Sequence, residues 1–449
     1  MFAADDASSL PNHYATHLAA VNQTHQVVST EDIYSDRGIL LFRKGSRVDA
    51  NAATHLLRHK LTQPLANSVQ ISHALDEEQL TQRFDALFAR YPDLATMNTA
   101  LDYAQEFQRL TRSRAISPML LQKLTVMAER LPDEFEQSLF CAWFASLIAR
   151  QLDLSPERRY AVWLAGLMHD IGYLHIPPEL TSHNTDITAE QWRAKQAHAV
   201  IGKMILQNTP GIHQETIQAV HEHHERCDGT GYPHGRRAAE LSLAGQILAM
   251  ADTIKTVRFG KLQTQGRHMG DIQPILNMYS NVHFSVIYQA TVRILRHCSL
   301  NMSKIPPQTD LNDYADALFR RGKALKEAVT ILMQRQVFEQ IKLVKKTPEA
   351  AGLFTVTDRA LGLTTRSGLV SDELLTWLEG MTREEVDANV LEELNEIELM
   401  QHELGWQLQD AVTTLAISLN DDAFIGTFEY ASLQAVIEDV RQCLARMAG

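Results

Sequence analysis

The side chains best suited to chemistry in this chain are its histidines. Nine of the 19 histidines fall between positions 169 and 234 of 449, whereas an even spread would place about three there. They are His169, His175, His183, His198, His213, His221, His223, His224 and His234. Two carboxylates accompany them: Asp170 follows His169 directly, and Asp252 follows five apolar residues. Imidazole and carboxylate ligands suit Fe, Mn, Ni or Zn, whereas calcium prefers oxygen ligands alone.

Four expected helices would position these groups. Their ranges are 158–172, 189–206, 214–225 and 241–257, and each has helical spacing of apolar residues. A buried carboxylate needs a hydrogen-bonding partner or a cation, because desolvating a lone charge is costly. A shared carboxylate with several imidazoles is typical of two metals that promote attack on a phosphoryl centre. The pattern therefore favours phosphate esters as substrates.

Each of these residues also has an ordinary structural interpretation. His198, in the middle of its helix, has the surroundings of a core histidine, and Asp252 could form a buried salt bridge. His223 and His224 could belong to a polar surface cluster with His221. The turn-rich loop Arg226–Pro233 follows directly, so it would form the lip of a site if the histidines bind metal.

Composition limits the possible functions. The net charge is -12, which disfavours binding to nucleic acid polymers or anionic membranes because both need a positive surface. No apolar run approaches the ~18 residues that span a bilayer. The four cysteines are widely spaced without a CxxC pair, so neither a disulfide framework nor a thiolate zinc site is expected. We expect a soluble protein of the reducing cytoplasm.

Low glycine and proline contents predict a mainly α protein. Apolar runs at 26–28 and 39–42, separated by a turn at 35–38, predict a β-hairpin within a small α+β unit at 1–75. A helical linker at 76–114, a helical domain at 115–300 and a helical C-terminal region at 301–449 would follow. Pro118, Pro132 and Pro156 mark expected helix starts. The amphipathic stretch 382–419 either packs on its own domain, which we favour, or binds a partner or a second copy.

The motifs resemble those of the HD-GYP family, a branch of the HD phosphohydrolases that hydrolyses the bacterial second messenger cyclic di-GMP. His169 and Asp170 match the HD motif within HDIGYLHIPPEL, His198 followed by Gly202 matches the next histidine element, and HHERCDGTGYP matches the signature. The resemblance covers roughly residues 120–300. It implies an all-helical HD-type domain, between the α+β unit and the helical C-terminal region.

The resemblance also implies the ligands of two divalent metals. Asp170 would bridge both metals, with His198, His223 and His224 completing one site, and His169 and Asp252 serving the other. The family adds a histidine on the preceding helix and often a glutamate one turn earlier. Those positions hold Gln137 and Asp133 here. A neutral amide is a poor ligand, so one metal would bind more weakly unless Asp133 or water compensates.

A second departure concerns the expected catalytic pair, Asp170 and Tyr173. Tyr173 stands where the family usually has lysine, and its hydroxyl offers a phosphate less charge stabilisation than an ammonium. Substrate contacts would come from Gly231, Tyr232 and Pro233 in the loop, and from Lys261 and Arg267 after Asp252. A solvated basic face is the alternative interpretation of those last two cations.

The expected function is therefore a metal-dependent phosphodiesterase that opens cyclic di-GMP to linear pGpG, with further hydrolysis to GMP left open. One alternative is a degenerate HD-GYP protein that acts as a cyclic di-GMP receptor or protein-interaction module without turnover. Another is an HD-type phosphohydrolase for a different nucleotide. Protein partners would bind through the loop or the C-terminal helices, and a homodimer is also expected.

Overall fold

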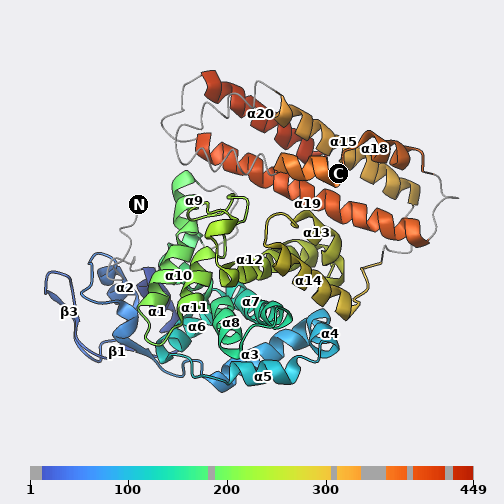
Figure 1. Ribbon diagram of the computed structural model, residues 1–449. Coiled ribbons are helices and arrows are strands. Elements are labelled where there is room, and N and C mark those ends of the chain that lie inside the picture. Colours follow the sequence, from blue (N-terminus) through green and yellow to red (C-terminus); the bar gives the residue numbers. More distant parts are fainter. Residues whose placement is uncertain are drawn as a thin grey trace.

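The computed structural model describes residues 13–180, 188–304, 311–334, 360–381, 388–419 and 428–447. Helices make up most of these residues, and four short strands lie near the N-terminus (Figure 1). The expected mainly α fold is confirmed. Among the described residues, no helix combines the length and the apolar content needed to cross a bilayer.

The N-terminal unit combines two helices with two small antiparallel sheets. Its elements are α1 (His13–Val21), β1 (Val27–Ser29), β2 (Ile33–Tyr34), β3 (Leu40–Phe42), α2 (Ala50–Leu56) and β4 (Val69–Ile71). The predicted turn is present, but β3 pairs with β2 rather than with the earlier apolar run. That run, β1, pairs with β4 in the register Val27 to Ile71. Local sequence identified the turn, but pairing between distant strands depends on tertiary packing.

Three helices follow where a linker was expected: α3 (Glu77–Arg90), α4 (Pro92–Ala100) and α5 (Ala104–Thr111). Asp76 and Gln79 form a capping box that starts α3. Phe84 of α3 packs edge-on against Phe107 of α5, and its ring centroid lies 6.5 Å from that of Trp163. These helices therefore share the hydrophobic core of the residues that follow.

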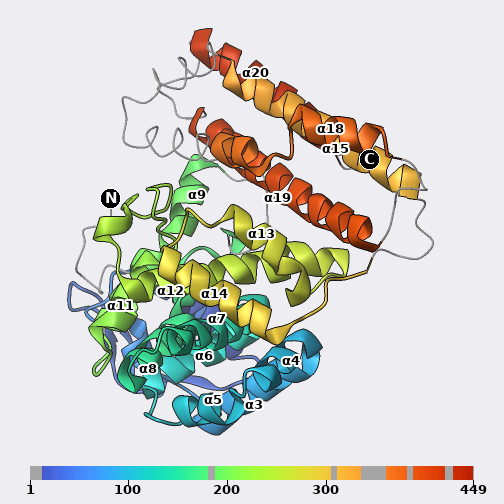
Figure 2. The same ribbon diagram turned by 45° about the vertical axis from the view of Figure 1, so that its right-hand side comes forward.

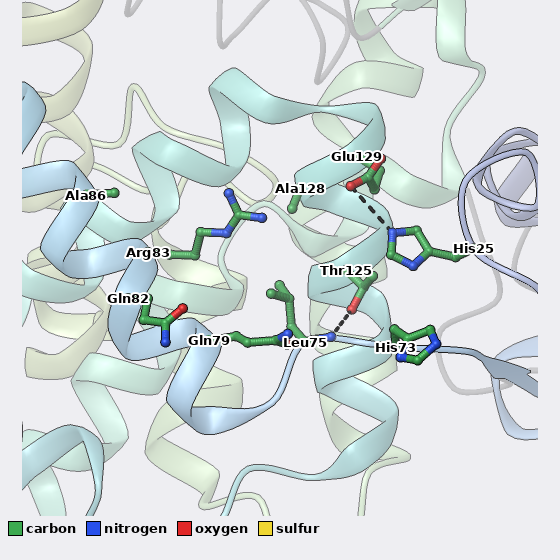
Figure 3. A pocket seen from close by; sticks show the side chains of 10 residues that line it. All are labelled: His25, His73, Leu75, Gln79, Gln82, Arg83, Ala86, Thr125, Ala128 and Glu129. Atoms are coloured by element: carbon green, nitrogen blue, oxygen red, sulfur yellow. Dashed lines mark hydrogen bonds and ion pairs between the residues drawn. The ribbon is translucent and has the colours of Figure 1, made fainter.

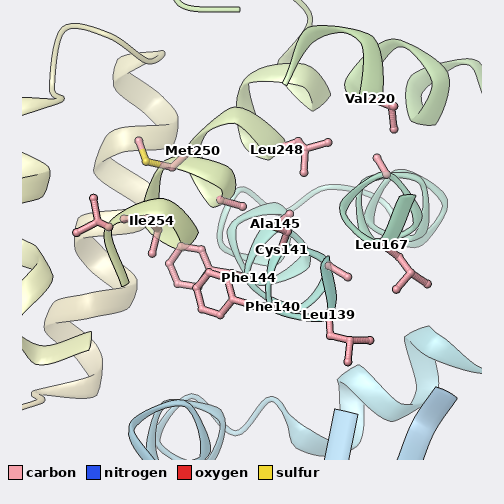
Figure 4. Close-up of a cluster of buried hydrophobic side chains, with 14 of the residues drawn as sticks. Leu139, Phe140, Cys141, Phe144, Ala145, Leu167, Val220, Leu248, Met250 and Ile254 are labelled. Carbon is pink, nitrogen blue, oxygen red and sulfur yellow. The ribbon is translucent and has the colours of Figure 1, made fainter. Parts of the chain in front are cut away.

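The central layer consists of α6 (Pro118–Arg130), α7 (Pro132–Gln151), α8 (Pro156–Met168), α10 (His198–Gln207), α11 (Gln214–Glu222), α12 (Leu243–Lys255) and α14 (Ser285–Cys298). The predicted helix starts are confirmed: Pro118, Pro132 and Pro156 are the first residues of α6, α7 and α8. At this position the backbone N–H has no partner within the helix, so proline costs no hydrogen bond. Helix α7 is buried continuously from Ser138 to Ala149. Figure 4 shows side chains of α7, α8 and α12 meeting around Cys141 and Phe144.

The expected helix at 189–206 is divided in two. Helix α9 (Ala189–Gln196) starts at a Thr188 capping box, and α10 begins again at His198 after Ala197. The expected helix at 158–172 likewise stops at Met168, and a 3-10 segment, Ile171–His175, follows Asp170. Because of these interruptions, His169, Asp170 and His198 lie at helix ends rather than within helices.

The C-terminal region contains α15 (Leu311–Met333), α18 (Asp372–Glu379), α19 (Ala388–Leu419) and α20 (Phe428–Ala445). Helix α19 packs against α15 and α20 and also against α13 (Ile272–Met278) of the central domain (Figures 1 and 2). Its predicted apolar positions Leu394, Ile397, Leu404 and Leu408 are buried. Residues 382–387 of the expected helix lie outside the described residues. For α19 itself, packing on its own chain is confirmed.

Candidate metal centre

Asp170 lies at the centre of a buried group of metal-ligand side chains. One ligand atom from each of Asp170, His198, His223 and His224 lies within 4.8 Å of the others. Asp170 Oδ1 is 3.4 Å from His198 Nε2 and 3.9 Å from His223 Nε2. His198 Nε2 is also 3.3 Å from His223 Nε2 and 3.1 Å from His224 Nε2. The first three of these residues are almost fully buried.

Backbone carbonyl groups fix the orientation of these imidazole rings. Nδ1 of His198 donates to the carbonyl oxygen of Lys195 at 2.7 Å, and Nδ1 of His223 donates to that of Val220 at 2.6 Å. A neutral ring with its proton on Nδ1 presents a lone pair on Nε2. The two Nε2 atoms therefore face each other as electron-pair donors, an arrangement that needs a cation between them.

The geometry of this group fits one divalent metal. Donors held about 2.1 Å from a metal, at angles between neighbours of ordinary size, lie roughly 3.0–3.9 Å apart. Burial is the largest cause that lowers the pKa of His223 to about 3, followed by His169 and His198. The same cause lowers the pKa of His198 and that of His224. These rings are therefore neutral near pH 7, which is the form that binds metal.

A second group lies on the other side of Asp170. It consists of Cys141, His169 and Asp252, whose ligand atoms also fall within 4.8 Å of one another. Nδ1 of His169 donates to the carbonyl oxygen of Gly166 at 2.8 Å, and its Nε2 lies 2.9 Å from Asp170 Oδ2. His169 Nε2 and Asp252 Oδ1 are buried and lack a hydrogen bond of good geometry to the described residues. The two oxygens of Asp170 thus face the two groups, as the bridging role requires.

Lys255 reaches into the second group from one helical turn beyond Asp252. Its Nζ lies 2.7 Å from Asp252 Oδ1 and 3.7 Å from Asp170 Oδ2. Burial alone would lower the pKa of Lys255, but Asp252 and Asp170 outweigh burial and raise it. Burial would raise the pKa of Asp170, but His169 and Lys255 hold it well below its ordinary value. Lys255 is therefore a buried ammonium between two carboxylates.

The loop Arg226–Pro233 covers the histidine pair. A Cβ on Gly231 would lie 2.4 Å from the carbonyl oxygen of His224, so only glycine permits this approach of the backbone. The next residue, Tyr232, stacks on the His224 ring with centroids 4.4 Å apart. Glu225 is fully buried and accepts hydrogen bonds from the backbone N–H groups of His234 and Arg236. These contacts place the loop directly against the histidine cluster.

Tyr173 is a second aromatic side chain against the imidazoles. Its ring is stacked on His198, with centroids 4.2 Å apart and an angle of 13° between the planes. A Cβ on Gly172 would lie 2.1 Å from the carbonyl oxygen of His198, so this glycine permits the contact. Burial raises the pKa of Tyr173 well above its ordinary value, and Asp170 adds to the rise. The Tyr173 hydroxyl is therefore neutral at physiological pH.

Comparison with known proteins agrees with this geometry. Residues 114–284 match the family model described as HD domain. This stretch is therefore similar to an HD domain. The chain is similar to 3'3'-cGAMP-specific phosphodiesterase 1 of Vibrio cholerae, with 32% identity over 123 residues, 27% of this chain and 28% of that protein. It is also similar to 3'3'-cGAMP-specific phosphodiesterase 3 of the same species, with 38% identity over 113 residues, 25% of this chain and 24% of that one.

A third relative is the cyclic di-GMP phosphodiesterase of Thermotoga maritima. It is 34% identical over 113 residues, which are 25% of this chain and 30% of that protein. Each of the three matches therefore spans less than a third of the relative's own length. Each match likewise covers about a quarter of this chain.

Two of the expected ligands, Asp133 and Gln137, lie on α7. Asp133 is exposed and Gln137 is half-buried on α7, and no hydrogen bond or ion pair joins either to the described residues of the centre. Cys141, one turn beyond Gln137, is the α7 residue that meets His169 and Asp252. Burial raises the pKa of the Cys141 thiol well above its ordinary value. The resemblance implied a histidine ligand from this helix, but the structure has the neutral thiol of Cys141 beside His169 and Asp252.

The expected phosphate-binding cations are engaged with the C-terminal region. Lys261 Nζ lies 2.8 Å from Glu403 Oε2, and Arg267 Nη2 lies 2.5 Å from Glu398 Oε2, both on α19. The structure therefore assigns Lys261 and Arg267 to the contact with α19 rather than to substrate. Little solvent reaches these cations, and a partly buried cation is stabilised by a carboxylate partner. The sequence could not show that α19 would supply those partners.

Sequence reasoning missed Cys141 and three cations near the candidate metal centre. Lys255 was recognisable as a basic residue at i+3 from Asp252, a spacing that places both on one helix face. Arg226 follows the histidine pair, and its Nη2 lies 3.9 Å from Asp252 Oδ2. Lys195 is half-buried, and Asp170 is close enough to raise its pKa against the larger lowering by burial. Arg226 lies within the signature HHERCDGTGYP but was given no role of its own, and no motif distinguished Lys195.

A separate cavity of about 320 Å³ lies beside the N-terminal unit (Figure 3). Its lining includes His25, His73, Arg83 and Glu129, and His25 Nε2 lies 3.6 Å from Glu129 Oε1. Thr125 accepts a hydrogen bond from the backbone N–H of Leu75 at its base. None of the lining residues belongs to either group of candidate metal ligands, so the cavity is separate from the candidate metal centre.

Proposed function

We propose that this chain is a metal-dependent phosphodiesterase that hydrolyses cyclic di-GMP to linear pGpG. The observation that carries the proposal is the buried group of Asp170, His198, His223 and His224, whose donor atoms lie within 4.8 Å of one another. HD phosphohydrolases are metal-dependent. Hydrolysis of the linear product to GMP is a second step that the same site could perform.

The four residues of this group would hold a divalent Fe, Mn, Ni or Zn ion. Such an ion, when bound, polarises a phosphoryl oxygen and makes water a stronger nucleophile. Asp170 keeps its negative charge because its pKa is held well below neutrality, and the imidazoles remain neutral. The chain thus supplies one charge and several neutral donors, a set that retains a dication without cancelling its Lewis acidity.

The surrounding side chains suit a cyclic dinucleotide. Tyr173 and Tyr232 form aromatic walls on two sides of the imidazoles, and aromatic rings of this kind stack on bases. Lys195 and Arg226 lie near Asp170 and Asp252, where they would face the phosphates in place of Lys261 and Arg267. Gly231 and Pro233 shape the loop that holds Tyr232.

The proposal also assigns tasks to regions of the chain. Residues 115–300 would perform catalysis, residues 1–75 and the helical segment 76–114 would communicate an input, and residues 301–449 would regulate the domain through α19. We place the reaction in the cytoplasm, where cyclic dinucleotides act. Protein partners would bind at the loop Arg226–Pro233, and a second copy of the chain would associate through the C-terminal region.

The test uses the full-length protein, loaded anaerobically with Fe(II) or Mn(II), and measures cyclic di-GMP and linear pGpG by chromatography. We expect linear product from the loaded protein and none after chelation. His223→Ala should abolish turnover, whereas His213→Ala, on the N-terminal turn before α11, should retain it. Fully metallated protein that binds the nucleotide without making product would overturn hydrolysis and support the receptor alternative. A parallel reaction with 3'3'-cGAMP, the nucleotide in the names of two relatives, tests the choice of substrate.

A further inference from the structure

We propose that the ammonium of Lys255 takes the place of a second metal, so that the centre holds one divalent ion. That ion would lie among Asp170, His198, His223 and His224. The inference rests on the proposed function for the presence of the first metal. It changes the expected two-metal centre into a centre built from one metal and one fixed organic cation.

The position of the ammonium is the first argument. Lys255 Nζ lies 2.7 Å from Asp252 Oδ1 and 3.7 Å from Asp170 Oδ2, so it contacts the two carboxylates that a second metal would have to share. Asp170 Oδ1 faces the imidazoles instead, at 3.4 Å from His198 Nε2. The single carboxylate of Asp170 therefore has one oxygen toward the metal-ligand group and the other toward Lys255.

The position of Lys255 on α12 holds its ammonium beside Asp252. Asp252 and Lys255 are three residues apart on α12, so they lie on the same face of one helix. Lys255 is 8% exposed, and Asp252 is 3% exposed. An ammonium buried to this extent requires carboxylate partners. Its removal from the two carboxylates would leave it unpaired, which opposes displacement by an incoming metal.

The remaining donors of the second group are also a poor metal site. Apart from the carboxylates, the group offers His169 and the Cys141 thiol, which is 0% exposed and packed within the core (Figure 4). By contrast, the first group offers three imidazoles. The positive charge of one dication and Lys255 together already exceeds the negative charge of the two buried carboxylates, Asp170 and Asp252. A second dication would therefore add uncompensated positive charge to a buried site.

The experiment counts metal ions in the full-length protein. Protein saturated with Mn(II) and desalted should contain one manganese per chain by elemental analysis, with the electron paramagnetic resonance spectrum of an isolated ion. Lys255→Met keeps the length of the side chain and removes its charge. It should raise the content to two ions per chain and produce the signal of a magnetically coupled pair.

Lys123→Met is the matched control. Lys123 is a lysine on α6 that is 2% exposed, and it contacts His175 rather than a carboxylate of the centre. The same substitution there should leave the metal content at one. If Lys255→Met does not fold, Asp252→Asn provides the second test, because Asp252 serves Lys255 in this proposal and its loss should leave one ion bound.

Two manganese ions in the unaltered protein would overturn the proposal, as would a single ion in folded Lys255→Met. Loss of an ion in Asp252→Asn would overturn it as well. These outcomes are separate from the failure of the proposed function. One bound ion without turnover would overturn the phosphodiesterase alone, whereas two bound ions with turnover would overturn the role of Lys255 alone.

Discussion

Lys261 donates to both carboxylate oxygens of Glu403, over 2.9 and 2.8 Å, and so joins the helical segment after Asp252 to α19. Glu403 is fully buried, and it also accepts a hydrogen bond from the Tyr279 hydroxyl. Burial would raise the pKa of Glu403, but Lys261 outweighs burial and lowers it. This ion pair makes α19 part of the structural environment of the metal centre.

The first prediction concerns this ion pair. Lys261→Met should lower the free energy of unfolding by about 3–5 kcal/mol, because Glu403 would remain buried without its cation. The double variant Lys261→Met, Glu403→Leu should recover much of that loss, since it removes both charges. Urea denaturation of the two single variants and the double variant measures the coupling. Single variants within about 0.5 kcal/mol of the unaltered protein would contradict the prediction.

The second prediction concerns the shared carboxylate. Asp170→Asn preserves the shape of the side chain and removes the charge that faces His198 and His223. We expect metal affinity to fall by about 100-fold or more, since even residues behind the ligands contribute about 10–100-fold. Competition with a chelating dye measures the affinity. Asp228→Asn, in the loop, is the control, because Asp228 accepts hydrogen bonds from Thr230. Equal affinities for the two variants would refute the role of Asp170.

The third prediction concerns the loop glycine. Gly231→Ala would place a Cβ 2.4 Å from the His224 carbonyl oxygen, so the backbone must move and Tyr232 must leave the His224 ring. We expect a loss of about 1–3 kcal/mol in stability, together with weaker metal binding. Gly260→Ala is a matched control, since a Cβ there meets no atom within 4 Å. Thermal unfolding and metal titration compare the stability and the metal affinity of the two variants. Equal values would show that the close approach of the Gly231 backbone to His224 is not required.

The fourth prediction concerns pH. Burial, followed by Lys203 and His234, lowers the pKa of His221 to about 3 from its ordinary value of 6.5. Between these two values the unfolded chain binds a proton at His221 that the folded protein does not, so stability falls as the pH decreases through this window. One histidine contributes a slope of about 1.4 kcal/mol per pH unit there.

His221→Gln should therefore show a shallower loss of stability between pH 6 and pH 4 than the unaltered protein. Urea denaturation of chelator-treated protein at several pH values measures the difference and avoids competition from bound metal. Above pH 7 the two slopes should agree, because His221 is neutral in both the folded and the unfolded chain. Identical slopes throughout the acidic range would show that His221 is protonated in the folded protein.

The sequence by itself determined the helical class and pointed to the histidines and carboxylates that the fold brings together. Residues within one motif lie close together in any fold, so His169 with Asp170 and His223 with His224 could be identified as pairs. Helix starts at Pro118, Pro132 and Pro156 were also determined locally, because proline fixes its own φ angle and lacks only an N–H that the first turn does not use.

Only the tertiary structure decided what surrounds each charge. Lys261 and Arg267 follow Asp252 and could have supplied charge to a phosphate, but Glu403 and Glu398 of α19 bind them from more than a hundred residues away. Cys141 lies beside His169 and Asp252 because α7 packs against α8 and α12. Lys255 lies between Asp170 and Asp252 because α8 and α12 bring those carboxylates together. Electrostatic partners depend on distance in space, and sequence spacing does not determine that distance between different helices.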